Sequence, residues 1–73
     1  MREYLKSLRL SNGQSQQDVA NALGMTRQNY SLIERGERQQ DINLTLLEKL
    51  SKYFCVSIKE LIDFESNYKK LDQ

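Results

Sequence analysis

The sequence predicts an all-α fold, a compact domain of five helices. Three features favour it: the chain has no proline, it holds no sustained alternation of β-branched residues, and amphipathic segments recur behind residues that cap helices. A chain of 73 residues makes one domain, and a domain this short buries only about 60% of the surface of its unfolded chain. The hydrophobic core is therefore expected to be small.

The first helix is predicted over about residues 2–10. Leu5 and Leu8 fall on one face of this helix, at the three-residue spacing of an amphipathic stripe. Asn12 and Gly13 follow, and both residue types tolerate the left-handed backbone that ends many helices. This pair therefore marks the end of the first helix.

Four further helix starts are marked by residues whose side chains can accept a hydrogen bond from a backbone N–H of the first turn. They are Ser15, Thr26, Asn43 and Ser57. Glu60 stands three residues after Ser57, which is the spacing of a capping box. Apolar residues placed for a hydrophobic staple surround three of these starts: Met25 with Tyr30, Ile42 with Leu47, and Val56 with Leu61.

Apolar residues behind the last two starts recur at the spacing of a helix that buries one face. Those expected in the core are Leu47, Leu50 and Phe54 in the fourth helix and Ile58, Leu61 and Ile62 in the fifth. Cys55, between the two helices, is expected to be a small buried hydrophobe. The folded domain is predicted over residues 1–65, with residues 66–73 as a C-terminal tail or an extension of the fifth helix.

The second and third helices are the most informative pair. Only Leu23, Gly24 and Met25 separate them, and Gly24 permits the positive φ of a tight turn. Ala20 has the small side chain that lets a following helix approach closely. The spacing therefore predicts a helix-turn-helix whose third helix leaves its polar residues outward.

The outward arc of the third helix holds Arg27, Gln28, Ser31 and Leu32. They offer the donors, acceptors and apolar contact that match base edges in the major groove of DNA. Net charge is only +1, but all five arginines precede Gln39, so residues 1–38 carry a net +2 and residues 39–73 a net −1. A polyanionic partner is therefore expected on the N-terminal half.

Composition argues against several other functions. With no histidine, one cysteine and no glycine-rich phosphate loop, neither a metal cluster nor a nucleophile–base pair can be assembled. We therefore expect that the protein is not an enzyme and that it binds no metal and no cofactor. No stretch approaches the roughly 18 apolar residues of a membrane helix, and no signal-peptide pattern is present. The expected location is the cytoplasm, without a membrane partner.

Many residues between about positions 5 and 62 match a known family when they are taken together. They are Leu8-Arg9, Gly13, Ser15-Gln16, Val19-Ala20, Leu23-Gly24-Met25-Thr26, Tyr30-Ser31, Ile33-Glu34-Arg35-Gly36, and Val56-Ser57 with Glu60-Leu61. Through them the chain resembles the Cro/repressor-type helix-turn-helix regulators of phages and bacteria, the XRE family. The resemblance implies a lambda-repressor-like fold, a double-stranded DNA partner, and an ion pair between Arg9 and Glu34.

The resemblance also implies roles at the front of the interface. Gln16, at the start of the second helix, would touch a phosphate and brace Gln28. Thr26 would add a second phosphate contact. Arg27 and Gln28 would read bases, because arginine can bond bidentately to guanine and glutamine to adenine.

Further along, the resemblance implies that Ser31 and Leu32 lie one turn beyond the main base readers. Family members commonly carry a polar residue at the second of these positions, so Leu32 would instead meet thymine methyl groups. Arg35 and Arg38 follow, where contacts to the DNA backbone are expected.

Two residues and the length of one loop depart from the family pattern. Gln14 stands where an apolar residue usually packs ahead of the second helix, and the loop between Gly36 and Leu44 is about two residues longer than the commonest form. Cys55 replaces a frequent glycine. A residue other than glycine there must accept a left-handed backbone or end the helix differently, so a modest cost in stability is expected.

Two function classes remain. The preferred one is a sequence-specific transcriptional regulator, a repressor that binds a palindromic operator as a homodimer, with recognition helices roughly 34 Å apart. The alternative is an antitoxin or another interaction module that uses the same fold to bind a partner protein. The homodimer is expected through the fifth helix, where a seam at 3–4–3 spacing is formed by Leu61, Phe64, Tyr68 and Leu71.

Overall fold

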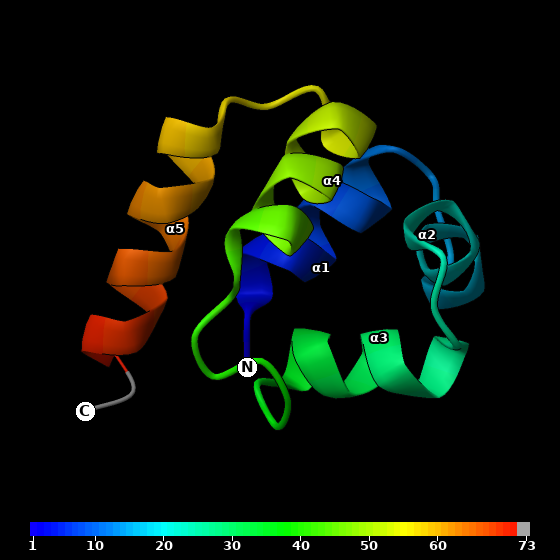
Figure 1. The fold of residues 1–73 in the computed structure, drawn as a ribbon, viewed down its shortest axis with the longest axis horizontal. Coiled ribbons are helices and arrows are strands. Elements are labelled where there is room, and N and C mark those ends of the chain that lie inside the picture. Colours follow the sequence, from blue (N-terminus) through cyan, green and yellow to red (C-terminus); the bar gives the residue numbers. More distant parts are fainter. Residues whose placement is uncertain (72–73) are drawn as a thin grey trace.

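The computed structural model describes residues 1–71 and shows five α-helices in that part of the chain (Figure 1). They are α1 (Glu3–Ser11), α2 (Gln16–Leu23), α3 (Arg27–Arg35), α4 (Leu44–Phe54) and α5 (Ile58–Leu71). The predicted all-α class is confirmed. The first helix lies one residue later than expected, and α5 runs on without a break to Leu71.

Side-chain caps begin the helices where the sequence pattern predicts them. Each of four residues accepts a hydrogen bond from the backbone N–H three positions later: Ser15, Thr26, Asn43 and Ser57. At Ser15 the cap is reciprocal, because the Asp18 carboxylate accepts a bond from the Ser15 N–H at 2.9 Å. These bonds hold the pKa of Asp18 below its usual value. The second helix thus has a capping box of its own.

Left-handed residues end α2 and α4. Gly24 has φ +73° after α2, and Cys55 has φ +57° after α4. Cys55 therefore accepts the left-handed backbone, one of the two alternatives expected for a residue that replaces glycine. Its side chain is exposed, so the expectation of a buried hydrophobe is wrong. The chain turns out of α4 at this residue, and the corner lies at the surface.

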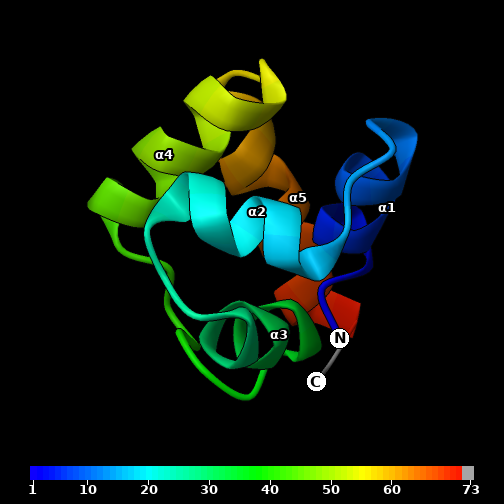
Figure 2. The same ribbon diagram turned by 90° about the vertical axis from the view of Figure 1, so that its right-hand side faces the viewer.

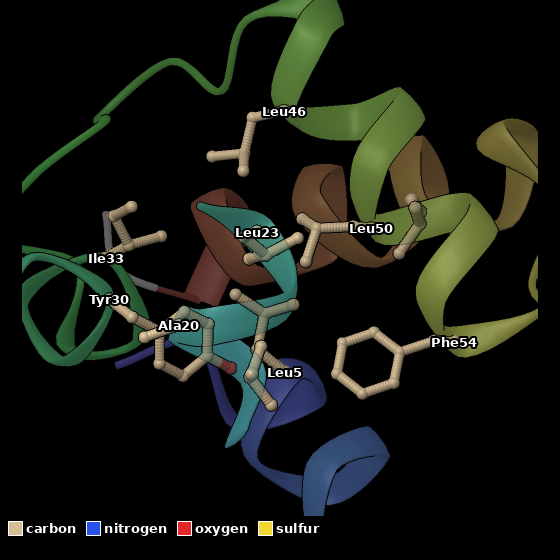
Figure 3. Close-up of a cluster of buried hydrophobic side chains, with 10 residues drawn as sticks. Leu5, Ala20, Leu23, Tyr30, Ile33, Leu46, Leu50 and Phe54 are labelled. Atoms are coloured by element: carbon tan, nitrogen blue, oxygen red, sulfur yellow. The ribbon is translucent and has the colours of Figure 1, made fainter. Parts of the chain in front are cut away.

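The hydrophobic core lies where the helices meet (Figure 3). Its buried side chains are Leu5, Val19, Ala20, Leu23, Tyr30, Ile33, Leu46, Leu50, Phe54 and Leu61. Three residues expected in the core are not fully buried: Leu47 and Ile58 are half-buried, and Ile62 is 48% exposed. In α4 Leu46 is buried where Leu47 was expected, and in α5 Glu65 is buried whereas Ile62 is exposed.

The predicted seam on α5 faces the chain's own interior. Leu61 is fully buried, Phe64 stacks on the Tyr4 ring of α1 with centroids 5.5 Å apart, and Tyr68 is half-buried. The side chain of Leu71 lies outside the described residues. Leu61 is therefore not open to a second copy, and Phe64 and Tyr68 contact residues of their own domain.

The helix-turn-helix is formed by α2 and α3. Its turn is closed by a hydrogen bond from the Met25 backbone N–H to the Ala20 carbonyl at 2.9 Å, next to the left-handed Gly24. In both views of the fold α3 lies along one edge of the molecule (Figures 1 and 2). One long face of this helix is consequently open to a partner.

Two buried ion pairs connect α1 to distant helices. Arg9 donates Nε and Nη2 to the two carboxylate oxygens of Glu34 in α3, each at 3.0 Å, which confirms the implied pair. Arg2 forms a second bidentate pair with Glu65 of α5 at 2.9 Å. No local pattern in the sequence indicates the second pair, because charged residues near a terminus usually lie at the surface.

Tyr4, which is half-buried, and Tyr30, which is buried, offer a comparison of two tyrosine hydroxyls. Tyr4 donates to Glu65 Oε1 at 2.6 Å, whereas Tyr30 Oη lies beside the pair of Arg9 and Glu34 but makes no hydrogen bond of normal geometry within residues 1–71. Tyr4→Phe should lower the free energy of unfolding by about 1.5 to 3 kcal/mol, the range for a bond to a charged group. Tyr30→Phe should leave it unchanged or raise it, because an unpaired polar group is removed. Equal losses in denaturant unfolding would contradict this assignment.

Candidate nucleic-acid interface

The outer face of α3 is polar and open to solvent. Arg27, Gln28 and Arg35 are exposed, while Ser31 and Leu32 are half-exposed. All five line one shallow hollow along the helix. The structure therefore brings five of the eight predicted contact residues together on one continuous surface.

The inner face of α3 holds this surface in place. Tyr30, Ile33 and Glu34 are buried against the rest of the domain. The carboxylate of Glu34 is clamped at both oxygens by Arg9, so α3 cannot rotate about its axis without breaking a buried ion pair. The outward residues are thus presented by a rigid helix.

A second hollow joins α2 to the start of α3. Its lining residues are Gln17, Asn21, Met25, Thr26, Arg27 and Gln28. The hydroxyl of Thr26 accepts a bond from the Asn29 backbone N–H at 3.1 Å and keeps its own proton to donate outward. Gln17 and Asn21, joined by a 2.8 Å hydrogen bond, are absent from the predicted set. Their four-residue spacing on one face of α2 is the signal that marks them.

Gln16 stands apart from both hollows. It is half-exposed as the first residue of α2 and forms no hydrogen bond with Gln28 within the described part of the chain. The bracing implied by the resemblance is therefore not present in this structure. Gln16 does lie at a helix N-terminus, where free backbone N–H groups and the helix dipole favour an anion such as phosphate.

Arg35 ends α3, and Arg38 lies in the loop that follows. Arg35 Nε lies 3.2 Å from Glu37 Oε2 in an exposed ion pair. Arg38, in the following loop, turns back so that its Nη1 donates to Asn29 Oδ1 at 2.9 Å. Because exposed pairs contribute roughly 0 to 1 kcal/mol, Arg35 can exchange Glu37 for a phosphate at little cost.

The surface is less rich in arginine than the sequence suggests. Arg2 and Arg9 are buried in ion pairs and offer no charge to a partner. The exposed arginines are Arg27, Arg35 and Arg38, all of them in α3 or just after it. The arginines available to a polyanion therefore lie only on α3 and the loop that follows it, and not across the N-terminal half of the chain.

A model of a known family describes the same helices. The helix-turn-helix model HTH_3 matches residues 5–61, a span that includes all of α2, α3 and α4. The chain belongs to the helix-turn-helix family of XRE (Cro/C1) type. It is thus a helix-turn-helix DNA-binding transcriptional regulator with a lambda-repressor-like fold, in a family that is not enzymatic.

Three regulators are similar to the chain over most of its length. One is an uncharacterized HTH-type transcriptional regulator of Methanocaldococcus jannaschii, 34% identical over 67 residues, which cover 92% of this chain and 98% of that protein. The others are the SPbeta prophage-derived uncharacterized HTH-type transcriptional regulator YonR of Bacillus subtilis, 45% identical over 60 residues, and the cryptic phage CTXphi transcriptional repressor RstR of Vibrio cholerae, 36% identical over 64 residues.

The extent of these matches differs between the relatives. The matches to YonR and RstR cover 82% and 86% of this chain but only 54% and 56% of those proteins. The chain thus spans about half the length of the two phage-derived relatives and nearly all of the archaeal one. No solved structure shows a significant match.

Other features of residues 1–71 lie outside this interface. No group of three or more His, Cys, Asp or Glu side chains among them could hold a metal ion, and none of their helices is long and apolar enough to cross a membrane. A further hollow lies between α5 on one side and the start of α4 with the loop that precedes it on the other. Its lining residues are Asp41, Ile42, Leu47, Ile62, Glu65, Ser66 and Lys69.

Proposed function

We propose that this regulator is a cytoplasmic repressor that recognises a specific operator with α3 in the major groove. The observation that supports this most is the continuous outer face of α3 at the edge of the molecule (Figure 2). A helix exposed in this way can enter a groove about 12 Å wide without a collision from the other helices. The name of RstR, a transcriptional repressor, favours repression over activation.

Each contact residue has a role in this proposal. Base reading is assigned to Arg27 and Gln28, with Ser31 and Leu32 meeting bases one turn further on. Phosphate contacts are assigned to Gln16, Thr26, Arg35 and Arg38. Base contacts set sequence preference and phosphate contacts set register and affinity, so the two groups have different mutational signatures.

Selection from random duplexes tests the function. We expect one enriched, two-fold symmetric sequence with half-site centres about 10 to 10.5 base pairs apart. The double variant Arg27→Ala with Gln28→Ala, run in parallel, should enrich a less defined sequence. No enrichment with the wild-type protein would remove the proposal, and an enriched single half-site would remove the symmetric dimer only.

Single substitutions separate the base readers from the phosphate contacts. Arg27→Ala and Gln28→Ala should each cost about 1 to 3 kcal/mol and relax preference at one operator position. Arg35→Ala should weaken binding on all sequences and reduce the slope of log affinity against log salt by about one. Lys59→Ala, an exposed charge removed from α5, is the control for net charge. Equal losses of specificity in Arg27→Ala, Gln28→Ala and Arg35→Ala would contradict these roles.

We also propose a homodimer, through a different surface from the predicted seam. One recognition helix makes few base contacts for selection among many genomic sites, and a second copy doubles them. The outer side of α5 has Ile62, 48% exposed, at the hollow that contains Ile42 and Leu47. Lys69 and Asp41, which are ion-paired with each other, flank these apolar residues and form a polar rim to the surface.

Ile62→Asp tests this dimer surface. A buried aspartate without a partner is costly, so we expect monomers in sedimentation equilibrium and weaker operator binding. The matched control is Leu10→Asp, because Leu10 is 57% exposed on α1 and does not line the hollow. A dimer retained by Ile62→Asp would exclude this surface. An unrelated small protein that co-purifies with wild type but not with Ile62→Asp would favour the antitoxin alternative.

A further inference from the structure

The guanidinium of Arg2 is completely buried. Its Nε and Nη2 donate to the two carboxylate oxygens of Glu65, each at 2.9 Å, and its central carbon lies 5.2 Å from the centre of the Tyr68 ring. Burial alone would lower the pKa of Arg2, but hydrogen bonding and the charge of Glu65 outweigh burial and raise it. Arg2 is therefore a permanent buried cation.

The remaining donors of Arg2 are directed at the backbone around the loop that joins α3 to α4. Nη1 donates to the carbonyl of Ile33 at 2.6 Å and to that of Arg38 at 3.2 Å. Nη2 donates to the carbonyl of Gln39 and, at 3.4 Å, to that of Gln40. Three consecutive carbonyl groups thus converge on one cation, and the start of the chain lies beside this loop in Figure 1.

Few other interactions hold the shape of this loop. Within residues 1–71 no backbone N–H donates to the carbonyls of residues 38–40, while the N–H groups of Glu37 and Arg38 reach back to the Leu32 carbonyl at 2.9 and 3.3 Å. Gln39 has φ +55°, a left-handed conformation that side chains other than glycine adopt uncommonly. Its carbonyl is among those that Arg2 holds, so the strained residue depends on this donor.

Arg38 is consequently fixed at both ends. Arg2 holds its carbonyl, and Asn29 of α3 accepts a bond from its Nη1 at 2.9 Å. The cation of Arg38 therefore lies along the flank of α3 before any DNA is bound. A side chain already in place loses less conformational freedom on binding, so more of its attraction for a phosphate appears as affinity.

We propose that Arg2, held by Glu65, is a positioning residue for DNA binding: it fixes the loop after α3 so that Arg38 stands beside the recognition helix and contacts a phosphate. This inference rests on the proposed function, because Arg38 meets the DNA backbone only if α3 reads the groove. Arg2 acts through the loop and does not touch DNA itself, since it is fully buried.

The paired variant Arg2→Met with Glu65→Gln tests the inference. It leaves no unpaired buried charge and keeps an acceptor for the Tyr4 hydroxyl, but the loop carbonyls lose their donors. In native-state hydrogen exchange we expect the Glu37 amide to exchange about ten-fold faster, with α2 and α4 unchanged. On the selected operator, the slope of log affinity against log salt should shrink by about one.

A double-mutant cycle assigns this loss to Arg38. Arg38→Ala should reduce the salt slope of the wild-type protein but add little in the paired variant, because the side chain is already displaced there. The control is Lys59→Gln, which removes an exposed charge from α5 and leaves Arg2, Glu65 and the loop untouched. It should change neither the exchange rate nor the salt slope.

Several outcomes decide the inference. Unchanged exchange and an unchanged salt slope in the paired variant overturn it, and so does a full-size effect of Arg38→Ala in that background. If the paired variant does not fold, Arg2→Lys, which keeps the charge but has fewer donors, replaces it in the same two measurements, with the same results expected. If the wild-type protein selects no DNA, the proposed function fails, and the exchange rates still show whether Arg2 shapes the loop.

Discussion

A charge buried in a small domain must be satisfied completely, and this constraint organises the whole molecule. Leaving one partner of a buried ion pair alone costs about 3 to 5 kcal/mol, a large share of the roughly 5 to 15 kcal/mol that stabilises a typical domain. Arg2 and Arg9 impose this condition at the two ends of α1. Each arginine admits one arrangement of its glutamate partner, so α1 sets the positions of α5 and α3.

The consequence for the proposed recognition of DNA is that α3 is held in place by contacts on the side opposite its exposed face. The pair of Arg9 with Glu34 sets the rotation of α3, and the cap at Thr26 sets where α3 begins. At the other end, Gly36 turns the chain out of the helix with φ +83°. A β-carbon at Gly36 would collide with the Tyr68 hydroxyl, so the last turns of α5 also help to define the end of α3.

What the sequence predicts well is local. The helix starts and the tight turn at Gly24 depend on residues within one helical turn of one another, and the structure has them where expected. The buried face of α5 is not local. Its apolar pattern favours Ile62, but Glu65 turns inward because Arg2, 63 positions away, needs a counter-charge. A stripe of apolar residues carries no information about such a partner.

The candidate site also has one part that local sequence patterns predict and one part that depends on distant residues. The outward arc of α3 follows from helical spacing and the buried residues opposite, whereas the roles of its side chains came from the family resemblance. The hydrogen bond from the exposed Arg38 side chain back to Asn29 has no counterpart in the sequence pattern. It depends on a loop whose carbonyl groups are held by Arg2, 36 to 38 positions earlier in the sequence.

The long separation between Arg2 and Glu65 also bears on how fast the domain folds. A contact between residues 63 positions apart closes a long loop and costs more chain entropy than the contacts between the neighbouring helices α2 and α3. The buried pair that fixes α5 to the start of α1 therefore adds a slow-forming contact to a domain whose helix-turn-helix is local.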